Sequence, residues 1–265
     1  MTISYYLKPV YSIGPLSLSS YFLFLSIAFI ACFFVASKLA REQGINRIYI
    51  IDLFTIVIIA SLFGSKLFGA IFENFDYYRE NPLRIFKIWE GGLVFYGGLI
   101  FGALAGLVYG YYRKIECAKL ADIGGITIPL GLAFGRVGCL AAGCCYGKVT
   151  SWGINYRSID NLLPQVLHFH PELAGVNLIP TQAIYSLVCF LIFLFLYILR
   201  KRFVGLLLPL FGMLYSLFRF IIEFYRADYR GVTFGILSVS QIISIIIFIV
   251  SLGFIVFRRK QGQVV

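Results

Sequence analysis

The sequence has few charged residues. Asp, Glu, Lys and Arg make up 13% of its 265 residues, whereas hydrophobic residues make up 60%. This shortage of charge, with a mean hydropathy of +0.88, excludes an ordinary soluble domain. The formal net charge of +11 does not require a nucleic-acid partner, because basic residues of membrane proteins gather in cytoplasmic loops and fix the orientation. We therefore predict an integral membrane protein that binds no nucleic acid.

Two features of exported proteins are also missing. No charged region precedes the first apolar run, so we expect residues 16–37 to be a retained span rather than a cleaved signal peptide. The six cysteines do not form the framework of a disulfide-rich secreted domain. Cys32 and Cys189 lie within apolar runs, where we expect them to act as small apolar residues.

Long apolar runs, by contrast, are abundant. A span needs about 20 apolar residues, and candidate runs cover residues 16–37, 48–72, 93–112, 121–142, 179–199, 204–222 and 234–257. Lys and Arg are more frequent in the loops that lie inside when the N-terminus is outside, which predicts a cytoplasmic C-terminus. We therefore predict an all-α, multi-pass protein of about seven spans, with residues 1–265 as a single transmembrane domain. The outer loop at about 143–178 is interpreted as solvated and lipid-facing, with a short strand or interfacial element at 152–156.

Three basic residues fall inside the predicted spans: Lys66, Arg136 and Arg219. A charge at the bilayer centre costs on the order of 3 kcal/mol by insertion scales, so such residues are candidates for a functional site. Around Arg136, glycines recur at helical spacing, which predicts close approach of a backbone or a ligand to the guanidinium. These glycines are Gly131, Gly135 and Gly138.

The sixth predicted span places four polar residues on one helix face. Tyr215, Arg219 and Glu223 follow one another at intervals of four, and Arg226 comes three residues later. Glu223 is positioned to orient both arginines. A purely structural ion-pair ladder at the helix end is the alternative interpretation.

The third predicted span carries glycines at every fourth position, a surface typical of close helix packing. They are Gly98, Gly102, Gly106 and Gly110. Just before them, Gly91-Gly92 and Gly97-Gly98 flank Tyr96, which suggests a place where the backbone approaches a ligand.

Two arginines on different membrane helices predict a site for an anion. The planar guanidinium donates hydrogen bonds in a fork that suits phosphate, and the anion at hand in a membrane is a phospholipid head group. Composition does not separate an enzyme from an anion or lipid transporter, but an evident inverted repeat, common among transporters, is missing.

Cys139, Cys144 and Cys145 form a second cluster beside Arg136. We interpret them as packing or disulfide residues. A reactive thiol and a zinc site shared with His168 and His170 stay open as alternatives. The spacing Cys-x4-Cys-Cys is uncommon for zinc, so we expect no metal and no cofactor.

Together the motifs resemble those of the prolipoprotein diacylglyceryl transferase family. The matching stretches run in family order over nearly the whole chain: Ser12-Ile-Gly14-Pro15-Leu with Tyr21, Trp89-Glu90-Gly91-Gly92 through Tyr96-Gly97-Gly98-Leu99, Gly135-Arg136-Val-Gly138, Pro180-Thr-Gln182, Tyr215 through Arg219-Phe-Ile-Ile-Glu223, and Ser240-Gln241-Ile-Ile-Ser244. The resemblance implies transfer of a diacylglyceryl group from phosphatidylglycerol to the lipobox cysteine of a prolipoprotein signal peptide, in the bacterial cytoplasmic (inner) membrane. A paralogous lipid transferase or a thiol-dependent enzyme with another acceptor is the alternative.

The resemblance also assigns candidate site residues. The catalytic set it implies is Arg136, Arg219, Glu223, Tyr96 and Tyr215. The substrate-binding set adds Gly97, Gly98, Gly135, Gly138, Lys66, Gln182 and Arg226. The chain departs from the family pattern at several positions. Tyr96 stands where a His would precede Gly97, and Lys66 stands where an Arg is common. After Gly138, the pattern has two Asn and a Glu, and this chain has Cys139, Ala142 and Cys144.

Overall fold

Long apolar helices dominate the structure, because a chain inside a bilayer must satisfy its backbone hydrogen bonds internally. This computed structural model describes residues 2–4, 7–13, 16–73, 75–87, 94–157, 163–227, 233–234 and 237–260. Among them, five helices have the length and hydropathy of a membrane span: α1 (Ser20–Glu42), α2 (Arg47–Phe68) with its continuation to Phe72, α5 (Cys117–Ala142), α7 (Thr181–Leu199) and α9 (Val239–Lys260). The prediction of a mostly helical, multi-pass membrane protein is confirmed.

Two shorter apolar helices complete the set that the sequence predicted: α4 (Phe95–Tyr112) and α8 (Leu207–Glu223). Each predicted span therefore contains one observed helix, although these two fall short of the length or hydropathy expected of a full span. The chain divides into two compact units, Ala36–Leu120 and Met1–Val35 with Ala121–Val265. Each unit is described by itself, and the single-domain interpretation stays a prediction.

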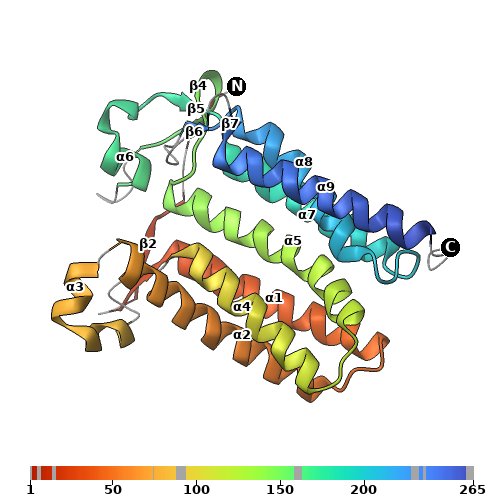
Figure 1. The fold of residues 1–265 in the computed structure, drawn as a ribbon. Coiled ribbons are helices and arrows are strands. Elements are labelled where there is room, and N and C mark those ends of the chain that lie inside the picture. The colour runs from red at the N-terminus through yellow and green to blue at the C-terminus, as the bar shows by residue number, and fades with distance from the viewer. Residues whose placement is uncertain are drawn as a thin grey trace. The chain divides into compact units, whose positions relative to one another are not determined.

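In the unit Ala36–Leu120, helices α2 and α4 pack closely along the predicted glycine surface (Figure 1). A Cβ added at Gly102 would lie 2.3 Å from Ser61 Oγ, and one added at Gly98 would lie 2.4 Å from Ser65 Oγ. The close-packing role predicted for these glycines is confirmed. Shorter elements follow α2: η1 (Gly69–Glu73), α3 (Phe75–Glu80) and η2 (Pro82–Phe86).

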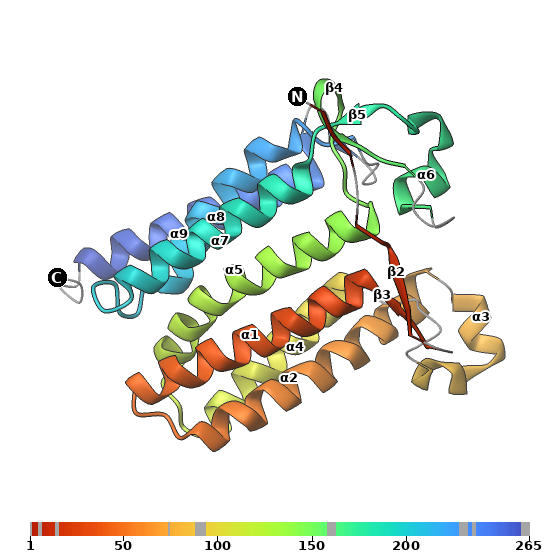
Figure 2. The same ribbon diagram turned by 180° about the vertical axis from the view of Figure 1, so that it is seen from behind.

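In the other unit, α7, α8 and α9 lie side by side, as both views show (Figures 1 and 2). Asp122 on α5 accepts hydrogen bonds from the backbone N–H groups of Gly205 and Leu207, at 2.6 and 3.0 Å. A carboxylate at this place satisfies N–H groups that a helix start leaves without a partner. Asp122 therefore fixes the start of α8 to α5.

Both ends of the chain differ from the predicted span boundaries. Leu16–Ser19 forms strand β3, which pairs with β2 (Val10–Ile13) in a hairpin, so the first helix begins at Ser20 and not at residue 16. The last helix begins at Val239 and not at residue 234, after β6 (Thr233–Phe234) and β7 (Leu237–Ser238). A capping box sets this start: Ser238 N–H donates to Gln241 Oε1, and Gln241 N–H donates to Ser238 Oγ.

The predicted outer loop is folded rather than merely solvated. Strand β4 (Val149–Asn155) pairs with β1 (Thr2–Ser4) and β5 (Asn177–Leu178), and α6 (Gln165–Phe169) and η4 (Pro171–Leu173) lie between β4 and β5 in the chain. The strand predicted at 152–156 is confirmed. The segment buries a hydrophobic core of its own, formed by Tyr146, Ile154, Tyr156, Val166, Leu167 and Leu178. That its outer surface faces solvent and lipid stays a prediction.

The α2–α4 contact gives a stability prediction. A Cβ at Gly64 would lie 2.5 Å from the backbone oxygen of Gly97, which cannot move aside, whereas one at Gly106 would find its nearest neighbour at 3.6 Å. We expect Gly64→Ala to lower the free energy of unfolding by about 1–3 kcal/mol despite the better helix propensity of alanine. The matched control Gly106→Ala should be neutral or slightly stabilising. Thermal unfolding of both variants in detergent measures this, and equal melting temperatures would contradict the packing.

Candidate functional site

Arg136 projects from α5 onto an aromatic ring of α7. Its guanidinium carbon lies 4.2 Å from the centroid of the Tyr185 ring, a cation–π contact. Among the residues that the structure describes, no carboxylate pairs with Arg136 and no group accepts a hydrogen bond from it. The side chain is partly exposed, so the donors of this guanidinium remain open to a ligand.

Arg219 approaches the same ring from α8. Its guanidinium carbon lies 5.9 Å from the Tyr185 centroid. Unlike Arg136, it is held on both sides, because it forms an ion pair with Glu223 and donates to Ser240 Oγ at 2.8 Å. The side chain is 8% exposed, so this is a buried and satisfied charge.

Glu223 fixes Arg219 and is itself fixed. One carboxylate oxygen pairs with Arg219, and the other accepts a hydrogen bond from Ser238 Oγ at 3.0 Å. Since Ser238 also caps α9, this carboxylate joins the end of α8 to the start of α9. The predicted pairing of Arg219 and Glu223 on one helix face is confirmed.

Tyr185 is the residue that sequence reasoning missed. It is fully buried, and its hydroxyl donates to the Tyr215 hydroxyl at 3.1 Å, which brings the predicted residue Tyr215 into the same cluster. A signal was present, because Tyr185 follows Gln182 by one helical turn in an otherwise apolar segment. The stretch Pro180-Thr-Gln182 thus lies at the start of α7. The next turn of this helix carries Tyr185, the ring that both guanidinium groups contact.

Arg226 lies outside the helix that was predicted to carry it. The helix α8 ends at Glu223, and Arg226 forms an isolated β-bridge with Gly147 instead. The prediction that Arg226 continues the helix face of Arg219 and Glu223 is therefore wrong. The bridge brings Arg226, which is 7% exposed, to the segment that follows α5.

The glycines near Arg136 do not surround its guanidinium. A Cβ at Gly138 would meet Tyr21 and Phe24 of α1 at 3.3–3.4 Å, and one at Gly131 would meet Cys32 at 3.3 Å. Two residues correspond to about 200° of turn at 3.6 residues per turn, so Gly138 faces away from Arg136. These two glycines serve close packing of α5 on α1, whereas a Cβ at Gly135 would meet nothing within 4 Å.

Four predicted site residues belong to the unit Ala36–Leu120: Lys66, Tyr96, Gly97 and Gly98. Lys66 is buried, with its Nζ 5.3 Å from the centroid of the Tyr78 ring. Gly97 and Gly98 pack against α2, which accounts for them structurally. Their contact with a substrate stays a prediction. The predicted stretch Trp89–Gly92 and residues Gly14 and Pro15 lie outside the described residues.

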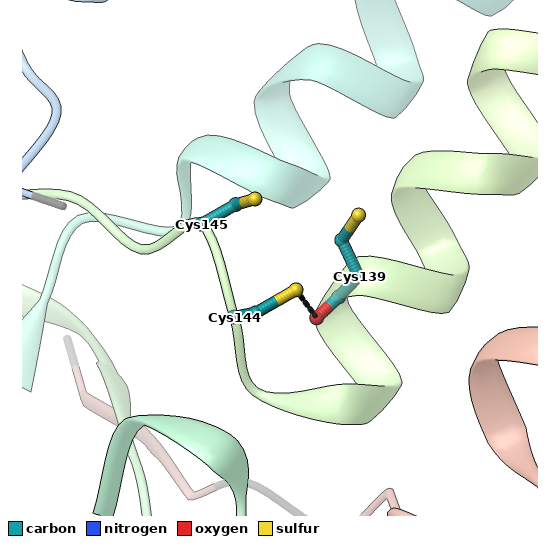
Figure 3. A group of neighbouring side chains, drawn as sticks. All are labelled: Cys139, Cys144 and Cys145. Carbon is teal, nitrogen blue, oxygen red and sulfur yellow. Dashed lines mark hydrogen bonds between the residues drawn. The ribbon is translucent and has the colours of Figure 1, made fainter. Parts of the chain in front are cut away.

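The cysteines gather at the turn that follows α5 (Figure 3). The turn is fixed by three hydrogen bonds: Cys144 N–H to Cys139 O at 3.1 Å, Gln182 Nε2 to Cys144 O at 2.6 Å, and Thr181 Oγ1 to Cys145 O at 2.7 Å. As a result, the three sulfur atoms all lie within 4.8 Å of one another. The sequence analysis treated these cysteines as one cluster, but it did not predict the left-handed turn that brings the three sulfurs together.

The shared environment changes the acidity of these thiols. Hydrogen bonds from the thiols of Cys139 and Cys144 hold the pKa of Cys145 below its usual range, and the charges of Arg226 and Arg136 act in the same direction. The pKa of Cys144 is raised by its hydrogen bonds to Cys139 and Cys145 and by burial. The three thiols therefore do not titrate independently of one another.

The two ends of the Gln182 side-chain amide differ in their hydrogen bonding. Its Nε2 donates to Cys144 O and to the Tyr156 hydroxyl, but its Oε1 is buried with no hydrogen-bond donor among the described residues. A buried polar atom without a partner costs about 1–3 kcal/mol. Gln182 thus presents a buried acceptor within the unit that carries both arginines.

Comparisons with known proteins agree with the motifs and the helical architecture. The profile of the family described as prolipoprotein diacylglyceryl transferase matches residues 8–257. The phosphatidylglycerol–prolipoprotein diacylglyceryl transferase of Geobacter sulfurreducens is 33% identical over 97% of this chain and 98% of its own length. The protein of that name from Oceanobacillus iheyensis is 32% identical over 94% of this chain and 86% of its own length. The transferase numbered 2 from Clostridium perfringens is 34% identical over 94% of each chain. The chain belongs to the prolipoprotein diacylglyceryl transferase family.

Proposed function

We propose that this protein transfers the diacylglyceryl group of phosphatidylglycerol to the lipobox cysteine thiol of prolipoproteins, and that Arg136 binds the phosphate of the donor. The observation that carries this assignment is the Arg136 guanidinium, stacked on Tyr185 with no acidic partner among the described residues. A cation held in this way keeps a hydrogen-bonding fork ready for an anion. The names of the curated relatives support the phosphate of phosphatidylglycerol as this anion.

The reaction needs fixed positive charge at the phosphate. The acceptor sulfur attacks the glycerol carbon that bears the phosphate ester, a C–S bond forms, and the C–O bond breaks to release glycerol phosphate. Negative charge develops on the departing phosphate, where preorganised donors in a dry site are worth about 2.7–4 kcal/mol each. Arg136 supplies hydrogen-bond donors that no described residue occupies. Arg219, which also contacts the Tyr185 ring, adds positive charge.

Glu223 is better suited to positioning than to proton transfer. Both carboxylate oxygens are engaged, one by Arg219 and one by Ser238. A carboxylate held in an ion pair with a guanidinium is a poor proton acceptor, even though its oxygens keep further lone pairs. Glu223 therefore acts through Arg219. Tyr215 supports the Tyr185 platform through its hydroxyl, and Tyr96 stays the tyrosine predicted to contact the substrate.

Gln182 contributes to recognition of the donor. Its buried Oε1 has no donor within the described part of the chain. Phosphatidylglycerol carries hydroxyl groups on its glycerol head, which are hydrogen-bond donors. A head-group hydroxyl on Gln182 Oε1 removes the cost of the unsatisfied oxygen.

The membrane arrangement follows the charge distribution. The N-terminus lies outside and the C-terminus in the cytoplasm of a bacterial cell, and the helices α4 and α8 cross the cytoplasmic membrane together with the five longer spans. In this orientation Arg136, near the end of α5, lies toward the outer face and next to the folded segment 143–178. Prolipoproteins reach that face by their signal peptides, which places the acceptor cysteine beside the donor lipid.

A genetic test addresses the activity itself. Expression of the chain in a bacterium depleted of its own diacylglyceryl transferase should restore growth and convert a reporter prolipoprotein to the diacylglyceryl form, seen as a mass increase on the lipobox cysteine. A reporter with Ser in place of that cysteine is the control and should stay unmodified. If the chain inserts into the membrane and the reporter cysteine still stays free, the proposed function is wrong.

Arg136 should be indispensable for turnover. We expect Arg136→Ala and Arg136→Lys both to lose at least about 100-fold in activity with labelled phosphatidylglycerol, because an ammonium does not reproduce the fork. Arg200→Ala is the matched control, since Arg200 also stacks on a tyrosine, 4.3 Å from the Tyr197 centroid, at the other end of α7. Near wild-type turnover of a membrane-inserted Arg136→Ala variant would remove the phosphate-binding role.

Arg219 and Glu223 should behave as one unit. In a double-mutant cycle with Arg219→Gln and Glu223→Gln, the double variant should be little worse than either single variant, with a coupling of about 0.5–3 kcal/mol in the activation free energy. The exposed pair Glu116 and Lys119, 3.0 Å apart, is the control and should show no coupling in activity. Additive losses at 219 and 223 would assign Glu223 to the helix end alone.

A further inference from the structure

Three sulfur atoms converge at the turn after α5 in a geometry that suits a metal ion. The sulfurs of Cys139, Cys144 and Cys145 lie within 4.8 Å of one another. In a tetrahedral zinc site with Zn–S bonds of about 2.3 Å, neighbouring sulfurs are about 3.8 Å apart. Only small side-chain rotations separate the two arrangements.

Adjacent cysteines do not ordinarily point at one ion, and the backbone of this turn explains how these do. Cys145 has φ 62°, in the left-handed region that non-glycine residues rarely adopt. This conformation costs of the order of 1–3 kcal/mol, and it persists here because Thr181 and Gln182 hold the carbonyl groups of Cys145 and Cys144. In Figure 3 the sulfur of Cys145 points from the turn toward the side of α5 that carries Cys139.

The cluster also has an open side. Cys144 and Cys145 line a cavity of about 260 Å³ together with Tyr146, Gln165, Val166 and His170, among others. Cysteines that serve packing alone are covered by other side chains, as Cys32 and Cys189 are. A cavity that two of the three cysteines line leaves room for a further ligand near the cluster.

The local charge suits a metal bound by three thiolates. Zinc with three thiolates carries a net negative charge, which needs nearby cations when it is partly buried. Arg136 precedes Cys139 by one helical turn, and both Arg136 and Arg226 act electrostatically on Cys145. Arg226, displaced from the predicted helix, thereby has a role at this cluster.

We propose that Cys139, Cys144 and Cys145 bind a zinc ion through their three sulfurs, and that the fourth coordination position, open to the cavity, takes the thiol of the acceptor. Three protein ligands with an open fourth position are typical of catalytic zinc, in contrast to closed structural sites. The spacing argument that disfavoured zinc does not hold once the left-handed Cys145 is taken into account. The metal site stands on the sulfur geometry, while the identity of the acceptor thiol rests on the proposed function.

The proposed zinc site accounts for how the acceptor thiol loses its proton. An acceptor thiol must be a thiolate to attack carbon, and coordination to zinc removes its proton. The family pattern has a His before Gly97, but this chain has Tyr96, and the cysteines at 139 and 144 occupy positions of an Asn and a Glu in that pattern. Tyr in place of that His and thiols in place of that Asn and Glu thus occur in the same molecule.

The step balances without an oxidant or reductant. The acceptor thiol binds zinc as a thiolate and releases its proton to water in the cavity. The thiolate sulfur then forms a bond to the glycerol carbon, the C–O bond to phosphate breaks with its electron pair, and glycerol phosphate leaves from Arg136. The product is a neutral thioether, a weak zinc ligand, which dissociates and reopens the fourth position.

The first measurement is the metal content of the full chain, purified in detergent with an affinity tag that contains no histidine. Mass spectrometry of metals should find about one zinc per chain, as expected of a three-thiolate site. Cys139→Ser, Cys144→Ser and Cys145→Ser should each lose it, while Cys32→Ser and Cys117→Ser keep it. Less than a tenth of an equivalent of zinc after purification and after addition of zinc chloride, or a disulfide between two of the three cysteines in the native protein, would overturn the proposal.

The second measurement tests the open position without turnover. Cobalt(II) in place of zinc should give sulfur-to-metal charge-transfer absorption, and a synthetic lipobox peptide with Cys should increase it while the same peptide with Ser should not. An unchanged spectrum with the Cys peptide would contradict coordination of the acceptor.

Activity then separates the two proposals. The three Ser variants should lose about 100-fold in transfer rate, with the loss concentrated in kcat at neutral pH and smaller at high pH, where the free thiol ionises unaided. If the wild-type chain modifies the reporter but the Ser variants are equally active, the zinc proposal fails and the transferase function stands. If zinc and the cobalt response are present but no lipid is transferred, the function fails and the metal site stands.

Discussion

The site depends on one aromatic ring that carries two cations. Tyr185 is buried between Arg136 and Arg219, yet the described residues around it offer a single carboxylate, Glu223, which is used by Arg219. Burying a charge without a partner is expensive, and a cation–π contact recovers only part of that cost, about 2 kcal/mol in a desolvated site. The unit therefore keeps a positive charge, which is why we propose that Arg136 binds the phosphate of the donor. The excess of positive charge that the helix packing creates suits the phosphate of a phospholipid donor.

The first turn of α7 joins this cation pair to the cysteine turn. Thr181 and Gln182 hold the carbonyl groups of Cys145 and Cys144, and Tyr185 follows one turn later as the platform for the arginines. Helix α5 also carries one member of each group, since Arg136 and Cys139 are one turn apart. The ends of these two helices thus set the position of Arg136 relative to the sulfurs. Precise placement of reacting groups is worth several kcal/mol of barrier, and here the arginine lies on a helix while the turn with Cys144 and Cys145 is held by hydrogen bonds from α7.

Close packing at glycines holds these helices where the site needs them. Gly131 and Gly138 let α5 approach α1 on the side opposite Arg136, and Gly125 lies against the backbone of Leu207 at the start of α8. In a membrane, helices gain little from hydrophobic burial against one another, so van der Waals contact at small residues and hydrogen bonds such as those of Asp122 stabilise their association. Gly131 and Gly138, which were expected to surround the guanidinium, pack against α1 instead.

The sequence by itself determined the membrane class, the approximate helices, the glycine surface of α4 and the Arg219–Glu223 pair, because these follow from local periodicity and from the cost of charge in lipid. It also singled out Arg136 and, through its motifs, the family. Only the tertiary structure decided what Arg136 contacts, that Arg226 lies beyond the helix, that Gly138 faces α1, and that segment 143–178 has its own core. Each of these depends on contacts between residues far apart in the chain or on where a helix ends. The convergence of Cys139, Cys144 and Cys145 is the clearest case, since it requires a left-handed residue held by side chains of another helix, and no spacing rule contains that information.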